Sequence, residues 1–392
     1  MSFIEMFMKT IIHVIAVISA AAIYMSCSAA RHLDSYVNRT INPPDNKISE
    51  ETIAFHNNLL IVDLHSDALL WERDIFVKSE RGHVDFPRMI EGNVAIQAFT
   101  IVSILPFMMN NSYNLAWTDS YCCLSFFQGW PAGTLFSFRD RAIYQINKLH
   151  DAEIRSGGKF TIIRTKSDLD SYLKRRRTDK SLTAGFIGLE GAYPLEGSAE
   201  NINAMFEAGV RMLGMTHFAD SDMAGSAHGF GKNGLTKKGR ELVELMNRKG
   251  IIIDLSHASR ESIKDILAIS TKPVIFSHTG VAGVCNNNRN ITDEEILGVA
   301  KSGGVIGAAF FSKATCSDNV DGIVNTIEYI VKLAGIDHAA LGSDFDGAVS
   351  VPVDSARMIY ITDALLKRGF TESDIRKIMG ENTIRVMREV LP

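Results

Sequence analysis

Residues 236–257 read TKKGRELVELMNRKGIIIDLSH, and this stretch carries the pattern that decides the fold. Its first part predicts a helix from Thr236 to Lys249, because a threonine cap precedes apolar residues at helical spacing and Gly250 follows them. Its second part, Ile251–Leu255, is a nearly continuous apolar run. Runs without polar alternation are typical of strands buried on both faces of a parallel sheet. The stretch therefore predicts one helix followed by one fully buried strand.

The same alternation extends through most of the chain. Eight apolar, β-branched runs are found: Leu59–Leu64, Val94–Val102, Ala184–Leu189, Arg211–Thr216, Ile251–Leu255, Pro273–Ser277, Val305–Phe311 and Ala339–Ser343. Further helical patterns cover Ala199–Ala208, Thr292–Lys301 and Thr371–Met379. Eight strands each followed by helix predict an α/β fold, a (β/α)8 TIM barrel, with an open doubly wound sheet as the alternative. The stretch from Ser103 to Thr183 is too long for one crossover, so we expect an extended insertion between strands 2 and 3.

Composition limits the classes of function. The chain has 392 residues, of which 46% are hydrophobic and 22% charged, as expected of a globular protein with a large core. A net charge of −4 gives no electrostatic reason to expect nucleic acid as a partner. The basic run Lys174–Arg177 is short and is interpreted as a solvated helix end.

The amino terminus predicts export. Lys9 precedes an apolar run from Thr10 to Met25, and small residues with Cys27 follow. A charged start, an apolar centre of this length and a small-residue exit are typical of a secretory signal. We therefore expect a lipoprotein-type signal peptide at residues 1–26, with Cys27 as the candidate lipid anchor. Plain secretion and an uncleaved anchor are the alternatives.

These segments predict where the protein acts and where its folded part begins. A lipid on Cys27 would hold the protein at a bacterial membrane, in the periplasm or cell envelope. Residues 27–50 are polar and contain Pro43-Pro44, so a tether is expected there. Residues 51–392 then form the barrel domain.

The remaining cysteines are Cys122, Cys123, Cys285 and Cys316, and their spacing does not match a metal site. Export permits disulfides, but the sequence does not indicate which cysteines would pair. The neighbours Cys122 and Cys123 are not expected to bond each other, given the geometry that a disulfide requires. We interpret all four as small buried hydrophobic residues.

Metal-capable or charged side chains follow six of the predicted strands. After the first strand, alternation along an extended chain points His65 and Asp67 to the same side. Five more strands are followed by one such residue each: Glu190, His217, His257, His278 and Asp344. Residues at the carboxyl ends of barrel strands converge on one mouth. Each alone would more often be a cap or a core residue, but their coincidence at six strands predicts a metal site.

The residue types indicate which metal this site binds. Imidazole and carboxylate ligands suit zinc, and there are enough of them for two ions. Five further histidines are assigned to structural roles: His56, His83, His150, His228 and His338.

Nine segments recur with the order and spacing of one known family: Asp63–Asp67, Gly188–Gly191, Leu213–His217, Gly234–Thr236, Ile253–Ser259, Pro273–His278, Asn288–Asn290, Gly342–Gly347 and Gly380–Val386. From about Asn58 to Val390 the chain resembles the membrane (renal) dipeptidase family of zinc peptidases, and its bacterial members in particular. The resemblance implies a hydrolase that cleaves dipeptides with two zinc ions and a metal-bridging hydroxide. It also implies a homodimer.

The resemblance implies a role for each site residue. His65 and Asp67 would bind one zinc, His257 and His278 the other, and Glu190 would bridge the two. His217 and Arg289 would hold the substrate, and Asp344 would move protons. General chemistry supports these roles, because a guanidinium pairs well with a free carboxylate and a positioned carboxylate can transfer protons.

Two other functions remain as alternatives, an amidohydrolase-type deacetylase or lactonase and a non-enzymatic binding barrel. Those hydrolases typically begin with His-x-His and often carry a lysine bridge, whereas this chain has His65-Ser66-Asp67 and Glu190. A binding barrel would be expected to have lost ligands. Phe310-Phe311 and Phe218–Ser221 depart from the family pattern, which leaves the preferred substrate side chain open.

Overall fold

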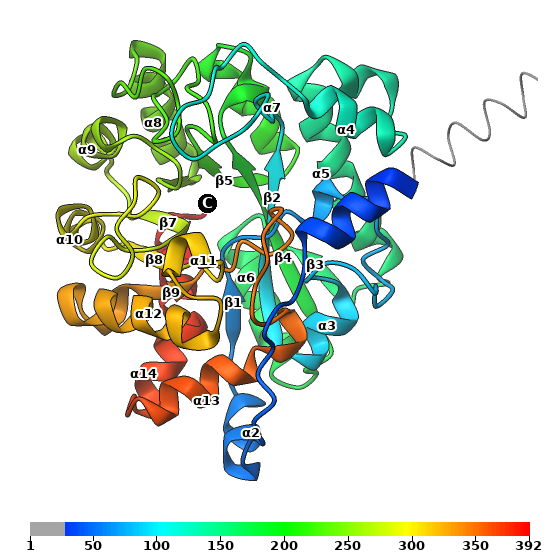
Figure 1. Cartoon of the computed structure of the whole chain (residues 1–392), viewed down its shortest axis with the longest axis vertical. Helices are drawn as coiled ribbons and strands as arrows, with labels where there is room; N and C mark the ends of the chain where they lie inside the picture. Colours follow the sequence, from blue (N-terminus) through cyan, green and yellow to red (C-terminus); the bar gives the residue numbers. More distant parts are fainter. Residues whose placement is uncertain (1–27) are drawn as a thin grey trace, which may run out of the picture.

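The computed structural model describes residues 28–392, and these residues form a closed parallel barrel surrounded by helices (Figure 1). The barrel strands are β1 (Ile61–Asp63), β2 (Val94–Val102), β4 (Thr183–Glu190), β5 (Val210–Gly214), β6 (Ile252–Asp254), β7 (Val274–Thr279), β8 (Val305–Ala308) and β9 (Ala339–Leu341). Neighbouring strands pair in this order, and the pairing of Asp63 in β1 with Leu341 in β9 closes the ring. The predicted TIM barrel is therefore confirmed, and the open sheet is excluded.

The eight predicted runs coincide with these eight strands, although the ends differ by a few residues. A ninth strand, β3 (Phe160–Ile162), was not predicted and pairs only with β4. It lies within the insertion between β2 and β4. The insertion also contains α4 (Tyr121–Phe127), α5 (Phe138–Arg155) and α6 (Lys166–Arg176), so the extra helices expected there are present.

Local sequence signals account for several helix ends. Thr236 caps α8 (Lys237–Lys249) by accepting a hydrogen bond from the Gly239 amide, and Gly250 ends it at a φ of 72°. Thr292 and Glu295 form a capping box at α10 (Asp293–Lys301). The remaining helices are α2 (Glu50–His56), α3 (Phe86–Glu91), α7 (Ile202–Glu207), α9 (Arg260–Ile269), α11 (Ser312–Thr315), α12 (Val320–Ala334), α13 (Ile359–Lys367), α14 (Glu372–Arg376) and α15 (Asn382–Val390).

The core extends from the barrel strands to the C-terminal helix. Every residue of β2, β4 and β7 is buried, as the unbroken apolar runs predicted. One buried cluster joins strand residues such as Ile252 and Ala340 to Ile384 and Met387 of α15. α15 therefore packs against the barrel strands.

The tether prediction needs correction for the residues that precede α2. Residues 28–37 are helical, and we call this segment the N-terminal helix. Its Asp34 is buried and forms ion pairs with Arg73 and Arg81, at 3.4 and 3.0 Å. Thr40 then forms a β-bridge with Val351. Polar composition suggested a free tether, but long-range ion pairs that composition does not reveal hold this segment against the barrel.

The predicted signal peptide at residues 1–26 and the candidate anchor Cys27 lie outside the described residues. Among residues 28–392, no helix combines the length and apolar character needed to cross a membrane. The lower domain limit at residue 51 stays a prediction.

Candidate metal centre

The structure brings all seven predicted strand-end residues together at the mouth of the barrel, and all seven are buried. His65 and Asp67 follow β1, Glu190 ends β4, and His278 lies in β7. Three more come from the segments after other strands: His217, His257 and Asp344. Donor atoms of these residues form three clusters, in each of which all atoms lie within 4.8 Å of one another. The strands are parallel, so their carboxyl ends lie at the same end of the barrel and bring together residues that are distant in sequence.

Glu190 lies between the two predicted zinc-binding pairs. Its Oε1 atom is 3.5 Å from Nε2 of His65, 3.0 Å from Nε2 of His257 and 3.6 Å from Nε2 of His278. Oδ1 of Asp67 is 3.6 Å from the same Nε2 atom of His65. Alternation along β1 had predicted that His65 and Asp67 would share a side, and they do.

Two of the seven residues have an unusual backbone. His257 has a φ of 64° and Asp344 a φ of 63°, both in the left-handed region that residues other than glycine rarely adopt. This conformation costs roughly 1–3 kcal/mol per residue, and such strain tends to occur at functional sites. The sharp turns after β6 and β9 are what aim these two side chains into the mouth.

The electrostatics of the centre favour a cation. Burial raises the pKa of Glu190 well above its usual value, and the nearby Asp67 raises it further. Burial opposes charge on His65, but the carboxylates of Glu190 and Asp67 outweigh it and raise the pKa of this imidazole to about 10. Burial lowers the pKa of His257 and His278 well below the usual value, so both imidazoles are neutral at pH 7. Neutral imidazoles beside carboxylates are the donor set that zinc binds.

The hydrogen bonds of the donor atoms test whether a metal fits. Nε2 of His65 and Oε2 of Glu190 are buried and have no hydrogen-bond partner among the described residues. Nε2 of His257 and Nε2 of His278 face each other at 3.0 Å. Buried polar atoms normally find a partner, and these instead point at a common centre. The residues present therefore fit a metal ion.

A second set of residues orients two of the imidazoles, and sequence reasoning did not assign it a role. The Ser277 hydroxyl donates to Asp254, so its oxygen is free to accept from Nδ1 of His65 at 3.1 Å and from Nδ1 of His278 at 3.0 Å. With the Nδ1 proton held by Ser277, the Nε2 atom of each imidazole is the one left to bind a metal ion. Such outer partners commonly fix the tautomer of metal-binding histidines. Asp254 and Ser277 lie in two of the segments that carry the family resemblance, Ile253–Ser259 and Pro273–His278, but only the fold shows what they contact.

His217 and Asp344 also lie within the clusters. Nε2 of His217 is 3.5 Å from Oε2 of Glu190, and Oδ1 of Asp344 is 3.8 Å from Nε2 of His65. Burial raises the pKa of Asp344 to about 7, although the nearby His65 lowers it. Geometry therefore permits both residues to bind metal or substrate, and their roles in substrate binding and proton transfer remain predictions.

The prediction for His228 was incomplete. Its ring stacks on Phe218 at 4.7 Å and lies 5.2 Å from the ring of His257, so it borders the centre. Its Nδ1 atom is 2.7 Å from the carbonyl oxygen of Asn111, in the insertion after β2. His228 does not follow a strand directly, which is why the strand-end criterion missed it.

The other histidines with predicted structural roles lie outside the three donor clusters. His56 bonds Thr362 and the Gly92 carbonyl, and His83 lies beside Asp346. His338 bonds the Gly304 carbonyl. His150 is also outside the clusters.

Arg289 projects toward the same mouth from the loop after β7. Its Nη2 atom donates to the carbonyl of His278 at 2.8 Å, and no carboxylate of the described residues lies within salt-bridge distance of its guanidinium. The nearby Asp293 is bonded instead to the Tyr329 hydroxyl, at 2.8 Å. Arg289 is thus a buried cation with donors left for an anionic ligand.

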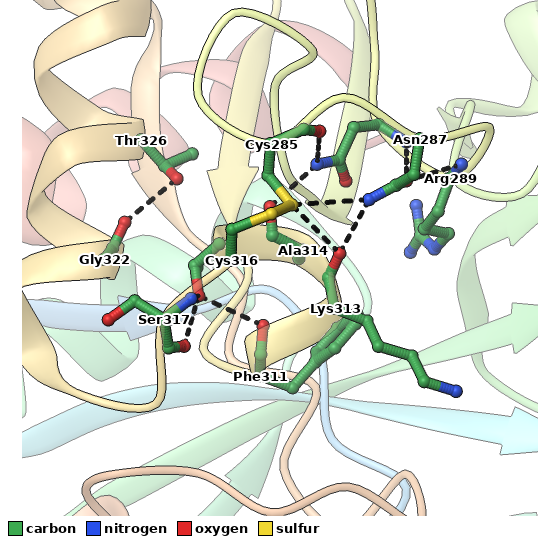
Figure 2. The surroundings of a disulfide bond; sticks show 12 residues. Cys285, Asn287, Arg289, Phe311, Lys313, Ala314, Cys316, Ser317, Gly322 and Thr326 are labelled. Carbon is green, nitrogen blue, oxygen red and sulfur yellow. Dashed lines mark hydrogen bonds between the residues drawn. A yellow bond between two sulfur atoms is a disulfide. The ribbon is translucent and has the colours of Figure 1, made fainter.

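A disulfide supports the loop that carries Arg289. Cys285 and Cys316 are joined, which corrects the interpretation of both as unpaired hydrophobic residues. Figure 2 shows Asn287 between this bond and Arg289. Its side-chain oxygen accepts from the Arg289 amide at 2.9 Å, and its amide nitrogen donates to the Lys313 carbonyl at 2.8 Å. Cys122 and Cys123 are free and not bonded to each other, as predicted, but Cys122 is partly exposed and Cys123 exposed, so their interpretation as buried residues was wrong.

A cavity of about 720 Å³ opens over the centre. Six residues at the mouth of the barrel line it: Asp67, Glu190, His217, His257, Arg289 and Asp344. Phe311 lines it too, so an apolar ring faces the cavity where the family pattern led us to expect a polar group. Cavities of this size commonly hold small-molecule ligands.

Residues 49–391 match the sequence model of the membrane dipeptidases, peptidase family M19. The fold is similar to that of dipeptidase AC, a metallopeptidase of family M19, with 23% identity, a TM-score of 0.70, and coverage of 85% of this chain and 99% of that one. It is also similar to a metallopeptidase from Rhodobacter sphaeroides liganded with a phosphinate mimic of the dipeptide L-Ala-D-Ala (24% identity, TM-score 0.69, 85% and 99% coverage). A third similar structure is the probable dipeptidase PvdM from Pseudomonas aeruginosa (20% identity, TM-score 0.73, 87% and 98% coverage). At these identities the three structures show the shared fold.

Proposed function

The chain belongs to the membrane dipeptidase family and is a metal-dependent hydrolase of dipeptides, and on this premise we propose that it works with two zinc ions bridged by Glu190. The observation that carries the proposal is the position of Glu190 Oε1, within 3.6 Å of Nε2 atoms of both predicted zinc-binding pairs. One pair is His65 with Asp67, and the other is His257 with His278. A carboxylate in this position can serve two ions at once.

The zinc ions would supply one piece of chemistry. Two of them at this centre would lower the pKa of a shared water to near neutrality, so that hydroxide is available at pH 7. Other residues of the chain orient the side chains that would bind the zinc ions. Ser277 and Asp254 hold two of the imidazoles with Nε2 toward the centre, and Thr100 donates to Oδ1 of Asp67 at 2.7 Å.

Three further residues act on the substrate in this proposal. Arg289 binds the free carboxylate of the dipeptide, because a guanidinium reads a carboxylate well and this one has free donors. His217 lies beside Glu190 and stabilises the oxygen of the scissile carbonyl as charge develops on it. Asp344 takes the proton of the attacking water at its carboxylate and delivers it to the leaving amine.

Metal analysis followed by a hydrolysis assay tests the proposal. We expect the purified protein to hold close to two zinc ions per chain and to hydrolyse dipeptides. Removal of zinc with a chelator should abolish hydrolysis, and re-addition should restore it. Hydrolysis of acetylated amines or lactones in place of dipeptides would favour the deacetylase or lactonase alternative. A protein that binds dipeptides without cleaving them would favour the binding barrel.

Arg289→Met should raise the KM for free dipeptides and reduce their advantage over dipeptide amides, which lack the carboxylate. Losing one partner of a desolvated, charge-assisted contact costs roughly 2–5 kcal/mol. The ratio of kcat/KM for a dipeptide to that for its amide measures this effect, with a melting curve beside it. Lys313→Met is the matched control, because Lys313 also lines the cavity. An unchanged ratio with a lowered melting temperature would make Arg289 a structural loop residue.

Export and lipid attachment belong to the proposal as well. The apolar run from Thr10 to Met25 and the position of Cys27 support a lipid-anchored protein of the bacterial cell envelope. The Cys285–Cys316 bond adds support, because disulfides persist mainly in oxidising compartments. A homodimer, as implied by the resemblance, also remains a prediction.

A further inference from the structure

The N-terminal helix forms part of the wall of the substrate cavity. Ala29, Ala30, Leu33 and Val37 line the cavity together with the metal-site residues. This helix precedes residue 49, where the match to the family begins. A segment outside the shared family sequence therefore helps to shape the site of this protein.

The wall that contains the helix is apolar. Leu70, Val102, Leu105 and Leu124 line the cavity beside the helix. Val37 packs against the buried cluster that includes Leu70, Val102 and Leu124. A charged side chain placed here would lose hydration without gaining a partner, whereas an apolar one would gain by leaving water.

The apolar wall and Arg289 lie on opposite sides of the barrel. Leu70 follows β1 and Val102 ends β2, whereas Arg289 follows β7. Around the closed ring, β2 and β7 are four strands apart in each direction. Figure 1 shows the N-terminal helix on the side of β2, β3 and α5, away from β7. A dipeptide whose carboxylate is held by Arg289 thus directs its amino-terminal residue across the metal centre toward the apolar wall.

We propose that the N-terminal helix completes an apolar subsite for the side chain of the amino-terminal residue, so that dipeptides with a bulky apolar first residue are preferred. This inference rests on the proposed function, because the orientation of the substrate comes from the Arg289 contact. The cavity volume of about 720 Å³ supports it, since this is space for a ligand larger than two small residues. Leu33 is half exposed and faces this space, so it is available to contact such a side chain.

The test compares three substrates, Phe-Ala, Ala-Phe and Ala-Ala, with the zinc-loaded full-length protein. We expect kcat/KM for Phe-Ala to exceed that for Ala-Ala by roughly tenfold or more, the scale on which apolar pockets discriminate added methylenes. Ala-Phe should show no comparable advantage, because its aromatic ring lies on the Arg289 side. No advantage for Phe-Ala, or an equal advantage for Ala-Phe, would overturn the proposal.

Variants of the N-terminal helix test whether the preference for Phe-Ala over Ala-Ala depends on this helix. Leu33→Ser with Val37→Ser should lower the ratio of Phe-Ala to Ala-Ala cleavage by roughly three- to tenfold. Leu33→Ser alone should act in the same direction and carries little folding risk, because this side chain is 46% exposed. Tyr36→Ser is the matched control: Tyr36 is on the same helix, is 69% exposed and does not line the cavity. A ratio that is unchanged in the Leu33 variants, or that falls equally in the Tyr36 variant, would contradict the role of the helix.

A failure of the proposed function would give a different result from a failure of the apolar subsite. If the zinc-loaded protein cleaves none of the three dipeptides, the dipeptidase mechanism is wrong whatever the subsite does. Calorimetric dissociation constants for the same dipeptides then decide the subsite. Tighter binding of Phe-Ala than Ala-Ala, reduced by Leu33→Ser, supports it, and equal binding overturns it.

Discussion

Glu190→Ala should leave the protein without measurable dipeptide hydrolysis and with fewer than two tightly bound zinc ions. Oε1 of Glu190 is close to Nε2 of His65, His257 and His278, and no other described side chain offers a carboxylate at that point between the two pairs. Removing it leaves the imidazoles without the negative charge that draws a cation to the centre. Losing the ions, or holding them only weakly, removes the source of hydroxide, so this variant carries the largest effect that we expect.

Zinc content and thermal melting with and without zinc measure this outcome. A ligand that binds only the folded state stabilises it by about 2.7 kcal/mol at a hundred times its dissociation constant, so zinc should raise the melting temperature of the parent. Glu190→Ala should lose most of that rise and still melt cooperatively without zinc, because burial already disfavours the charged form of Glu190. Glu295→Ala is the control, because Glu295 is a buried glutamate in the capping box of α10 and should affect stability but not zinc. Two tightly held ions in Glu190→Ala would disprove the bridging role.

Asp344→Asn should lower kcat by roughly 10²–10⁴-fold while the zinc content stays near that of the parent, because positioned general acids and bases contribute on this scale. The amide has the shape of the carboxylate but cannot accept the proton of the water. Because Asp344 falls in a cluster with His65 and Asp67, its direct binding of metal is a real alternative. Zinc analysis beside single-turnover kinetics separates the two, since the loss of zinc together with activity would place Asp344 among the ligands.

Asp346→Asn is the matched control for disturbance of the loop after β9. Asp346 is fully buried, accepts from the amides of His83 and Val84, and pairs with Arg73 at 2.9 Å. Breaking one partner of a buried pair costs about 3–5 kcal/mol. We therefore expect this variant to lose stability, with its folded fraction keeping far more turnover than Asp344→Asn does.

The strands and the candidate metal centre could be predicted because their signals are local. Ile251–Leu255 and the seven other apolar runs mark strands that must be buried on both faces, whatever else the chain does. The barrel then carries the carboxyl end of each strand to one mouth. His65 and Glu190, 125 residues apart in number, could therefore be expected to meet before either was placed in space.

Other features could not be predicted because they depend on contacts between segments far apart in the chain. The N-terminal helix gives no local sign that its Asp34 pairs with Arg73 and Arg81. Nor does the spacing of the cysteines show that Cys285 meets Cys316, since the two loops come together only when β7 and β8 pair. His228 reaches the ring of His257 through a loop that has no periodic pattern.

By itself, then, the sequence determined which elements form, in what order, and which donor groups converge at the mouth. The spacing of apolar residues is a local property of the chain, and the order of the strands follows the order of the apolar runs. The tertiary structure alone decided how those donors are oriented and what surrounds them. Ser277 holds the Nδ1 atoms of His65 and His278, and Leu33, in a helix that precedes the family match, lines the cavity. The physical reason is that hydrogen-bond direction and cavity shape depend on the separation of atoms in space, which is set only when the whole chain has packed.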